Sequence, residues 1–293
     1  MVADVVVQEG DHDGGAVAGS ISGVRVGVGQ VRSGEDVDGN LGAVETVIRD
    51  AASRGAELVA IPEYAGYLGR SSSAVVAPLG DGRLERLCVD LARDLGVWIV
   101  GGTVAEREGE AVFDTTPVIA PDGEIVARYR KIHLFDVELP GQPPFRESAT
   151  FMPGHELVTH ETPGGRVGLA ICYDLRFPEL FRGLMALGAE TIVVPSQFQH
   201  VTGQAHWHVL VRARAVENQC FVVAPAQWGA YGDPQDGRRS YGHSLVVGPW
   251  GDVLAEAPEE GDVAVVVDLD PSELRRVRRA LPALQHRRLG LVC

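Results

Sequence analysis

Apolar positions along this chain follow two periods, one of two residues and one of three to four, and stretches of each kind alternate. The strict alternation in VRVGVGQV at 24–31 predicts a strand, and apolar residues on one face over 36–53 predict the helix after it. Further strands are expected at 57–61, 97–104, 166–172, 190–195, 220–225 and 263–269, and further helices at 83–95, 178–187, 205–218 and 272–280. Turn residues at 121–123 and 248–251 predict two hairpins. This order is typical of an α/β fold.

Two stretches lack this periodicity. Residues 1–22 are acidic and rich in Gly and Ser, which predicts a disordered tail before a single domain at 23–293. Residues 132–160 are rich in Pro and Gly without a clear period. A loop of that length inside a compact domain is usually functional, so we expect part of the site there.

The chain also repeats itself. GAELVAIP at 55–62 matches GAETIVVP at 188–195, and VIAPDGEIVA at 118–127 matches VVGPWGDVLA at 246–255 at nearly the same separation. Two half-domains related by a pseudo-two-fold axis would each carry a mixed sheet with helices on one face, and the bare faces would bury each other. We therefore expect a four-layer α-β-β-α sandwich. The alternative, a single doubly wound sheet, gives no reason for the repeat, and the chain has no GxGxxG pattern to favour a dinucleotide site.

Charge and hydropathy narrow the range of partners. The formal net charge is −14, which argues against binding to nucleic acid or to anionic lipid. No apolar run approaches the roughly 18–20 residues of a membrane span, so we expect no membrane partner. The N-terminal sequence has no basic region followed by an apolar core, and a cytoplasmic location is therefore expected.

Two residue types are distributed unusually. Of the 26 basic residues, all but Lys131 are arginine. Lysine carries a compact point charge where arginine carries a wide fork, so a crowded site can require the one and exclude the other. The cysteines, Cys88, Cys172, Cys220 and Cys293, are far apart and form no CxxC pair, which argues against a zinc site or a disulfide framework. Cys88 and Cys220 lie in apolar patterns and are expected in the core.

Three predicted strands end in a polar or reactive side chain, namely Glu63, Lys131 and Cys172. The carboxyl ends of strands are where catalytic groups gather in α/β folds. A thiol, a carboxylate and a fixed cation are together sufficient for nucleophilic acyl transfer.

Histidine is an alternative base, since His133, His206, His208 and His243 are all available, and spacing alone leaves the choice open. His206 and His208 would point apart on a helix, so no metal pair is expected there.

The same residues resemble a known family. IPEY at 61–64, YRKIHLFD at 129–136 and ICYDLRFPEL at 171–180 are similar, in order, to the three motifs of the nitrilase superfamily, the carbon–nitrogen hydrolases. The resemblance extends over about residues 24–291 and implies the same α-β-β-α sandwich. It implies Glu63 as general base, Lys131 as the cation at the oxyanion, Cys172 as nucleophile and Glu138 as a second glutamate that orients the site. It also implies chemistry without a metal or an organic cofactor.

Longer segments resemble the Nit branch of that family, which holds deaminated glutathione amidases and omega-amidases. These segments are 136–142, 195–229, 239–251 and 281–288. The implied activity is a cysteine-dependent amidase that hydrolyses small carboxylate-bearing amides to acid and ammonia through a thioester, most like deaminated glutathione amidase. An omega-amidase acting on 2-oxoglutaramate, an N-carbamoyl amino acid hydrolase and a non-catalytic binding protein of the same fold are the alternatives.

Details of substrate binding follow from these motifs. The backbone N–H of Tyr173 is expected to help hold the oxyanion. Arg176 is expected either to grip a substrate carboxylate or to pair with Asp174 or Glu179, and Thr202 is expected to face the pocket. The segment SQFQHVTG departs from the expected pattern, because Gln197, Gln199 and His200 replace smaller residues.

The predicted helices at 178–188 and 206–219 are apolar on more than one face. One sheet contact cannot cover so broad a surface, so a two-fold homodimer or a higher assembly is expected. The resemblance implies an interface through the same two helices.

Overall fold

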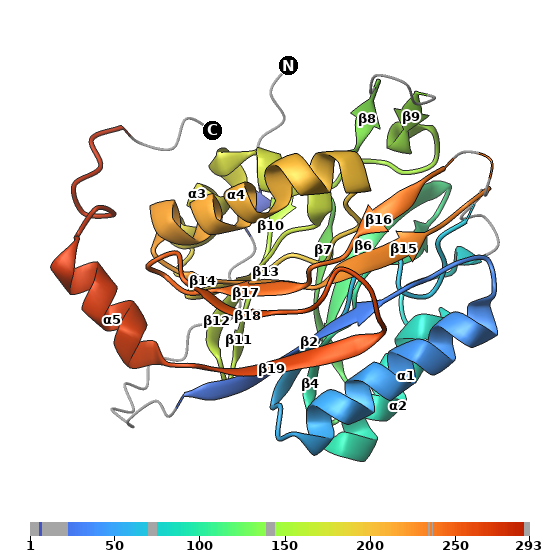
Figure 1. Ribbon diagram of the computed structural model, residues 1–293, viewed down its shortest axis with the longest axis horizontal. Coiled ribbons are helices and arrows are strands. Elements are labelled where there is room, and N and C mark those ends of the chain that lie inside the picture. The colour runs from blue at the N-terminus through green and yellow to red at the C-terminus, as the bar shows by residue number, and fades with distance from the viewer. Residues whose placement is uncertain are drawn as a thin grey trace.

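A computed structural model describes residues 6–7, 23–69, 75–138, 144–233, 235 and 237–289. Two main β-sheets lie face to face, with α1 and α2 on the outside of one and α3 and α4 on the outside of the other (Figure 1). The helices are α1 (Val37–Ser53), α2 (Arg83–Leu95), α3 (Pro178–Ala186), α4 (His200–Asn218) and α5 (Pro271–Ala280). The α-β-β-α sandwich expected from the internal repeat is therefore confirmed.

The larger sheet has nine strands in the order β16-β15-β2-β3-β4-β6-β5, with β19 pairing with β2 and β7 pairing with β6. These strands are β2 (Val24–Val31), β3 (Leu58–Ala60), β4 (Trp98–Val100), β5 (Val104–Glu108), β6 (Ala111–Ile119), β7 (Ile125–Arg130), β15 (Ala226–Ala230), β16 (Arg239–Tyr241) and β19 (Val263–Leu269).

The smaller sheet has six strands in the order β11-β12-β13-β14-β17-β18. They are β11 (Thr159–Thr162), β12 (Gly165–Leu169), β13 (Thr191–Val193), β14 (Phe221–Ala224), β17 (Leu245–Val247) and β18 (Val253–Glu256). Two short pairs lie apart, the antiparallel β8 (Asp136–Val137) with β9 (Phe145–Arg146), and the parallel β1 (Val6–Val7) with β10 (Glu156–Leu157).

The two sheets share a pairing pattern. Strands β2, β3 and β4 are parallel and are followed by the antiparallel strands β6 and β7, while β12, β13 and β14 are parallel and are followed by the antiparallel strands β17 and β18. The two sequence repeats fall on equivalent places, β3 with β13 and the β6–β7 hairpin with the β17–β18 hairpin. The pseudo-two-fold symmetry read from the sequence is thus present in the fold.

Strand β2 shows how its sequence sets the layers. Val24, Val26 and Val28 point into the core between the sheets. Gly27 and Gly29 face α1 on the other side, where a Cβ would lie 2.6 Å from Cβ of Ala51 at the first position and 2.8 Å from Cγ1 of Val47 at the second. The glycines therefore let α1 pack close to the sheet.

Several predicted bounds hold, but the single strand predicted at 97–104 is two strands, β4 and β5. Helix α4 begins at His200, five residues earlier than predicted, and so includes Gly203, where a Cβ would lie 2.4 Å from Cβ of Tyr241. Short β15 and β16 were not predicted. The proposed tail at 1–22 lies outside the described residues except for Val6–Val7. In the described part of the chain, no helix is long and apolar enough to cross a membrane.

Candidate active site

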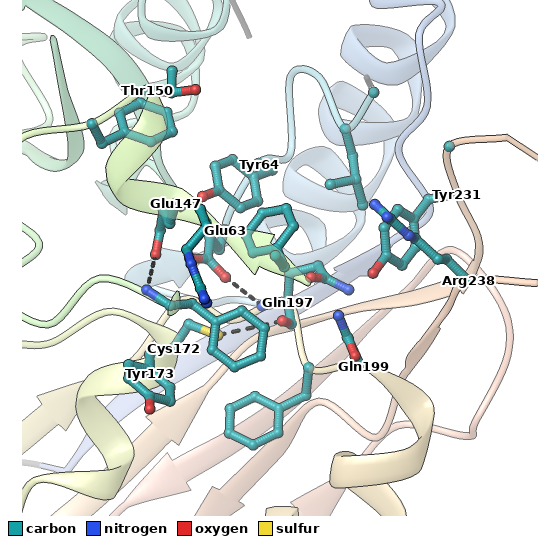
Figure 2. Close-up of a pocket in the computed structure, with 18 of the residues that line it drawn as sticks. Glu63, Tyr64, Glu147, Thr150, Cys172, Tyr173, Gln197, Gln199, Tyr231 and Arg238 are labelled. Atoms are coloured by element: carbon teal, nitrogen blue, oxygen red, sulfur yellow. Dashed lines mark hydrogen bonds between the residues drawn. The ribbon is translucent and has the colours of Figure 1, made fainter. Parts of the chain in front are cut away.

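The three strand-end residues line one pocket, in which Glu63 and Cys172 lie close together (Figure 2). Glu63 follows β3, Lys131 follows β7 directly, and Cys172 follows β12 and opens the 3₁₀-helix η3 (Cys172–Arg176). Nζ of Lys131 lies 2.7 Å from Oε1 of Glu63. The backbone of Gln197 bridges Glu63 and Cys172. Its N–H donates to Oε2 of Glu63 at 2.7 Å, and its carbonyl accepts from Sγ of Cys172 at 3.3 Å.

The turn after β3 is fixed by its surroundings. Gly102 has a φ of 62° and packs so closely that a Cβ would lie 2.2 Å from the carbonyl oxygen of Pro62. The buried amide of Gln227 donates to the carbonyl of Glu63 at 3.0 Å and also to Oγ of Ser33 at 2.9 Å. These contacts hold the Glu63 backbone in place and leave its carboxylate for the site.

Cys172 has a φ of 42°, a left-handed conformation that costs a non-glycine residue about 1–3 kcal/mol. The buried carboxylate of Asp174 offsets this cost. Its Oδ2 accepts from the backbone N–H of Ile171 at 2.9 Å and from the hydroxyl of Tyr129 at 2.7 Å, while its Oδ1 accepts from the N–H of His133 at 3.1 Å. Tyr129 and His133 flank Lys131 in sequence, so Asp174 links the turn at Cys172 to the strand that precedes Lys131.

Lys131 lies among three buried carboxylates. Its Nζ is 2.7 Å from Oε1 of Glu63, 2.9 Å from Oε1 of Glu147 and 3.8 Å from Oδ2 of Asp114. Burial alone would lower the pKa of Lys131, but attraction to Glu147 and Glu63 outweighs it and the net pKa is raised. The three carboxylates are close enough together to hold a cation, and the ammonium of Lys131 is that cation.

Burial also shifts the pKa values of Glu63 and Cys172. It raises the pKa of Glu63 in spite of the nearby ammonium of Lys131. Burial raises the pKa of the Cys172 thiol as well, and the negative charge of Glu63 adds to that effect. A thiol with a raised pKa needs a base to become a nucleophile, and Glu63 lies beside it.

The second glutamate is not where the sequence placed it. The side chain of Glu138 is 68% exposed and pairs with Arg146, and Glu138 does not line the pocket. Glu147 occupies the expected place: it is buried, contacts Lys131, and accepts from the hydroxyl of Tyr64 at 2.7 Å. In the described structure Glu147, and not Glu138, lies beside Lys131, so Glu147 becomes the candidate for the second glutamate. The loop at 132–160 holds both acids, and no local pattern distinguishes them.

The four candidate histidines lie elsewhere. His133 is 2.7 Å from Asp174 through Nδ1 and stacks on Phe177, His206 contacts Arg176, and His208 and His243 both contact Glu256. None of the four lines the pocket that holds Cys172. The geometry therefore places Glu63, and no candidate histidine, beside the thiol.

A pocket of about 240 Å³ opens above Cys172. Arg176 lines it, with Nη1 3.3 Å from Nδ1 of His206 and its guanidinium over the rings of Tyr173 and Phe198. The ion pair with Asp174 or Glu179 that was the alternative for Arg176 does not form in the described structure, where Asp174 binds other partners.

Other residues around the pocket come from α4 and the segment before it. Thr202 lines the pocket as expected and donates to the carbonyl of Gln199 at 3.2 Å. Gln197 and Gln199 line it too, whereas His200 pairs with Glu259 outside it. Tyr64 and Tyr231 complete the wall, and neither was predicted from sequence (Figure 2).

A pair of glutamates around one lysine, next to a cysteine in a strained turn of an α-β-β-α sandwich, is the arrangement that the sequence motifs had indicated. The family model "Carbon-nitrogen hydrolase" matches residues 25–279. The chain belongs to the carbon–nitrogen hydrolase family and is a hydrolase of carbon–nitrogen bonds other than peptide bonds.

Two relatives and one solved structure show which branch of the family this chain resembles. The chain is 43% identical over 275 residues to the human protein named deaminated glutathione amidase, an alignment that covers 91% of this chain and 83% of that protein. It is 38% identical to human omega-amidase NIT2, covering 83% of this chain and 87% of the relative. The crystal structure of Saccharomyces cerevisiae Nit3, described as a member of branch 10 of the nitrilase superfamily, superposes with a TM-score of 0.81 at 32% identity, covering 93% of this chain and all of the other. The resemblance to the Nit branch is thus confirmed.

Proposed function

We propose that this protein is a cysteine-dependent amidase that acts on deaminated glutathione. The amide of that substrate is secondary, so the products are an acid and an amine, and not the acid and ammonia expected from the sequence. The main support is the contact of Lys131 with Glu63 beside the Cys172 thiol, in a chain 43% identical to a deaminated glutathione amidase. The pocket favours a substrate with a carboxylate, because the guanidinium of Arg176 lines it and forms no ion pair with a carboxylate of the described residues, whereas Arg146 is paired with Glu138.

Acylation would begin with proton transfer. Glu63 takes the proton of the Cys172 thiol as the sulfur attacks the amide carbon, and both electrons of the carbonyl π bond move to oxygen. Lys131 and the backbone N–H of Tyr173 stabilise the oxyanion, since the first N–H groups of a helical turn lack an intrahelical partner. Glu63 then gives the proton to the leaving nitrogen, and the C–N bond breaks to leave a thioester.

Deacylation would use the same base. Glu63 takes a proton from water, the hydroxide attacks the thioester carbon, and the sulfur leaves as a thiolate that regains the proton. Every step uses a side chain of the site, so no metal or organic cofactor is required. Arg176 is proposed to bind a substrate carboxylate, with Thr202 lining the acyl pocket.

The substrate is tested by side-by-side kinetics. We expect kcat/KM for deaminated glutathione to exceed that for 2-oxoglutaramate, and that for an N-carbamoyl amino acid, by about tenfold or more. A higher value for 2-oxoglutaramate would make the protein an omega-amidase, and a higher value for the carbamoyl compound would make it a carbamoylase. Absence of turnover and of any trapped thioester would favour a binding protein instead.

Glu147 is proposed to position Lys131 and to tune Glu63. Glu147→Gln should lower kcat by about 10² because it removes the carboxylate that shares the ammonium with Glu63. Because the charge of Glu147 raises the pKa of Glu63, its loss lowers that pKa and should move the acid limb of the kcat/KM profile to lower pH.

Glu138→Gln is the matched control, since it makes the same change at the exposed acid of the same loop. It should leave both kcat and the pH profile unchanged. The reverse pattern, with Glu138 sensitive and Glu147 tolerant, would restore the original assignment.

We further propose a homodimer through α4. Helix α3, which the sequence analysis placed in the same interface, has no large apolar side chain among the exposed ones, so α4 carries the proposal. Val209 and Val216 on this helix are 68% and 46% exposed, and Trp250 beside the β17–β18 turn is 51% exposed. Covering these side chains with a second copy would remove apolar area from water. Light scattering at micromolar concentration should give about twice 31.3 kDa.

Val209→Glu should shift the mass to that of one chain, while Met152→Glu, at an apolar residue that is 54% exposed elsewhere, should not. A single-chain mass for the unaltered protein would refute the dimer. The cytoplasmic location expected from the N-terminal sequence likewise remains a prediction.

A further inference from the structure

A second group of reactive side chains lies outside the pocket, between α4 and the β17–β18 hairpin. His208 comes from α4, His243 from the turn that precedes β17, and Glu256 is the last residue of β18. Oε1 of Glu256 is 2.9 Å from Nε2 of His208 and 2.7 Å from Nδ1 of His243. One imidazole nitrogen of each histidine and one carboxylate oxygen of Glu256 all lie within 4.8 Å of one another. None of the three residues lines the active-site pocket.

The backbone holds these three positions together. Nε1 of Trp207, next to His208, donates to the carbonyl of His243 at 2.8 Å. The N–H of Ala257, next to Glu256, donates to the carbonyl of Ser244 at 2.8 Å. The ring of Tyr241 packs against both imidazoles, with centroids 6.0 Å from His208 and 4.5 Å from His243. His208, His243 and Glu256 are thus held near one another by contacts that do not involve the carboxylate of Glu256.

We propose that His208, His243 and Glu256 form a binding site for Zn²⁺ or a similar late first-row divalent cation. Two imidazole nitrogens and one carboxylate oxygen suit these metals, whereas Mg²⁺ and Ca²⁺ require oxygen ligands. Bond lengths of about 2.0–2.2 Å place neighbouring tetrahedral ligands about 3.3 Å apart, which side-chain rotation can reach from the observed spacing.

On binding, the ring nitrogens that face Glu256 would coordinate unprotonated, and each imidazole would keep its proton on the other nitrogen. The side chains of His208 and Glu256 are each 34% exposed, so the fourth position is open to water. The metal would then cross-link α4 to the end of β18 and stabilise the folded chain by linkage.

The cluster of His208, His243 and Glu256 is distinct from the pair of histidines on α4, His206 and His208. His206 and His208 were expected to point apart, and they do, since His206 contacts Arg176 while His208 contacts Glu256. The partners of His208 come from residues far along the chain that only the fold brings near. The buried acids Glu63, Asp114 and Glu147 are not a second metal site, because Lys131 already supplies their cation.

Zinc titration tests the site directly. The full chain carrying Cys172→Ala, which removes the active-site thiol as a competing ligand, would be stripped with a chelator and titrated with ZnCl₂ by calorimetry. We expect saturable binding of one Zn²⁺ per chain and a visible absorption band of four-coordinate Co²⁺ on replacement. Glu256→Gln and His208→Gln should each weaken zinc binding by about tenfold or more.

His155→Gln is the matched control, because His155 is an exposed histidine 3.8 Å from another acid, Glu156. It should bind zinc like its parent. Glu256→Gln is also made without the Cys172→Ala change. In the absence of metal, this variant should retain the parental melting temperature and amidase rate, so that its weaker zinc binding cannot be attributed to misfolding. Absence of saturable binding, or stoichiometric binding that persists in the Glu256→Gln, His208→Gln double variant, would overturn the proposal.

Discussion

Replacing Cys172 with alanine or serine should abolish amide hydrolysis, with a loss in kcat of roughly 10⁴-fold or more. Alanine removes the atom that would form the thioester. Serine keeps a hydroxyl, but its much weaker acidity leaves Glu63 unable to generate the nucleophile. Steady-state kinetics on deaminated glutathione, with mass spectrometry of the intact chain for an acyl adduct, checks both changes.

The control for Cys172 is another buried cysteine. Cys88 is fully buried against α1 and the larger sheet, and burial raises the pKa of its thiol to about 12. Cys88→Ala should keep activity because Cys88 does not line the pocket, and iodoacetamide should label Cys172, which lines the pocket, in preference to Cys88. Turnover by a well-folded Cys172→Ala variant would refute the proposed nucleophile.

Lys131→Arg should lower kcat by about 10²–10³ although it conserves the charge. Lys131 is 2% exposed and places one nitrogen between Glu63 and Glu147. A guanidinium is wider, and it would displace those carboxylates or miss the oxyanion. The measurement is kcat together with the rate of thioester formation in a single turnover.

Arg130→Lys makes the opposite exchange one residue earlier. Arg130 pairs with Glu106 at 2.6 Å and Glu108 at 2.8 Å, away from the pocket, so this variant should keep kcat within a few fold. Wild-type kcat in Lys131→Arg would show that the oxyanion does not depend on the lysine. A matching loss in Arg130→Lys would instead indicate a general sensitivity of this strand.

The strained turn at Cys172 has a structural cost that Asp174 offsets. The two oxygens of Asp174 bind the backbone before the cysteine and the side chains on either side of Lys131. The positions of Cys172 and Lys131 are therefore linked through one buried carboxylate. This link holds together two motifs that are about forty residues apart in the sequence.

Local pattern was enough to predict much of this protein. The bounds of β2, α2 and β19 coincide with the predicted segments, because a period of two or of three to four residues is a property of neighbouring residues. The internal repeat predicted the sandwich, because two similar halves must bury similar faces. Glu63, Lys131 and Cys172 were proposed as site residues in the same way, each as a polar or reactive residue at the end of an apolar strand, and the structure brings them to one pocket.

Other features depended on contacts between distant segments, and only the tertiary structure decided them. Glu138 and Glu147 share an aperiodic loop, and which of them reaches Lys131 depends on how the short strands β8 and β9 fold back. Likewise Glu256 meets His208 only because the β17–β18 hairpin lies beside α4. A carboxylate that is buried and paired and one that is exposed have the same local sequence signal, since burial is set by what the rest of the chain packs against them.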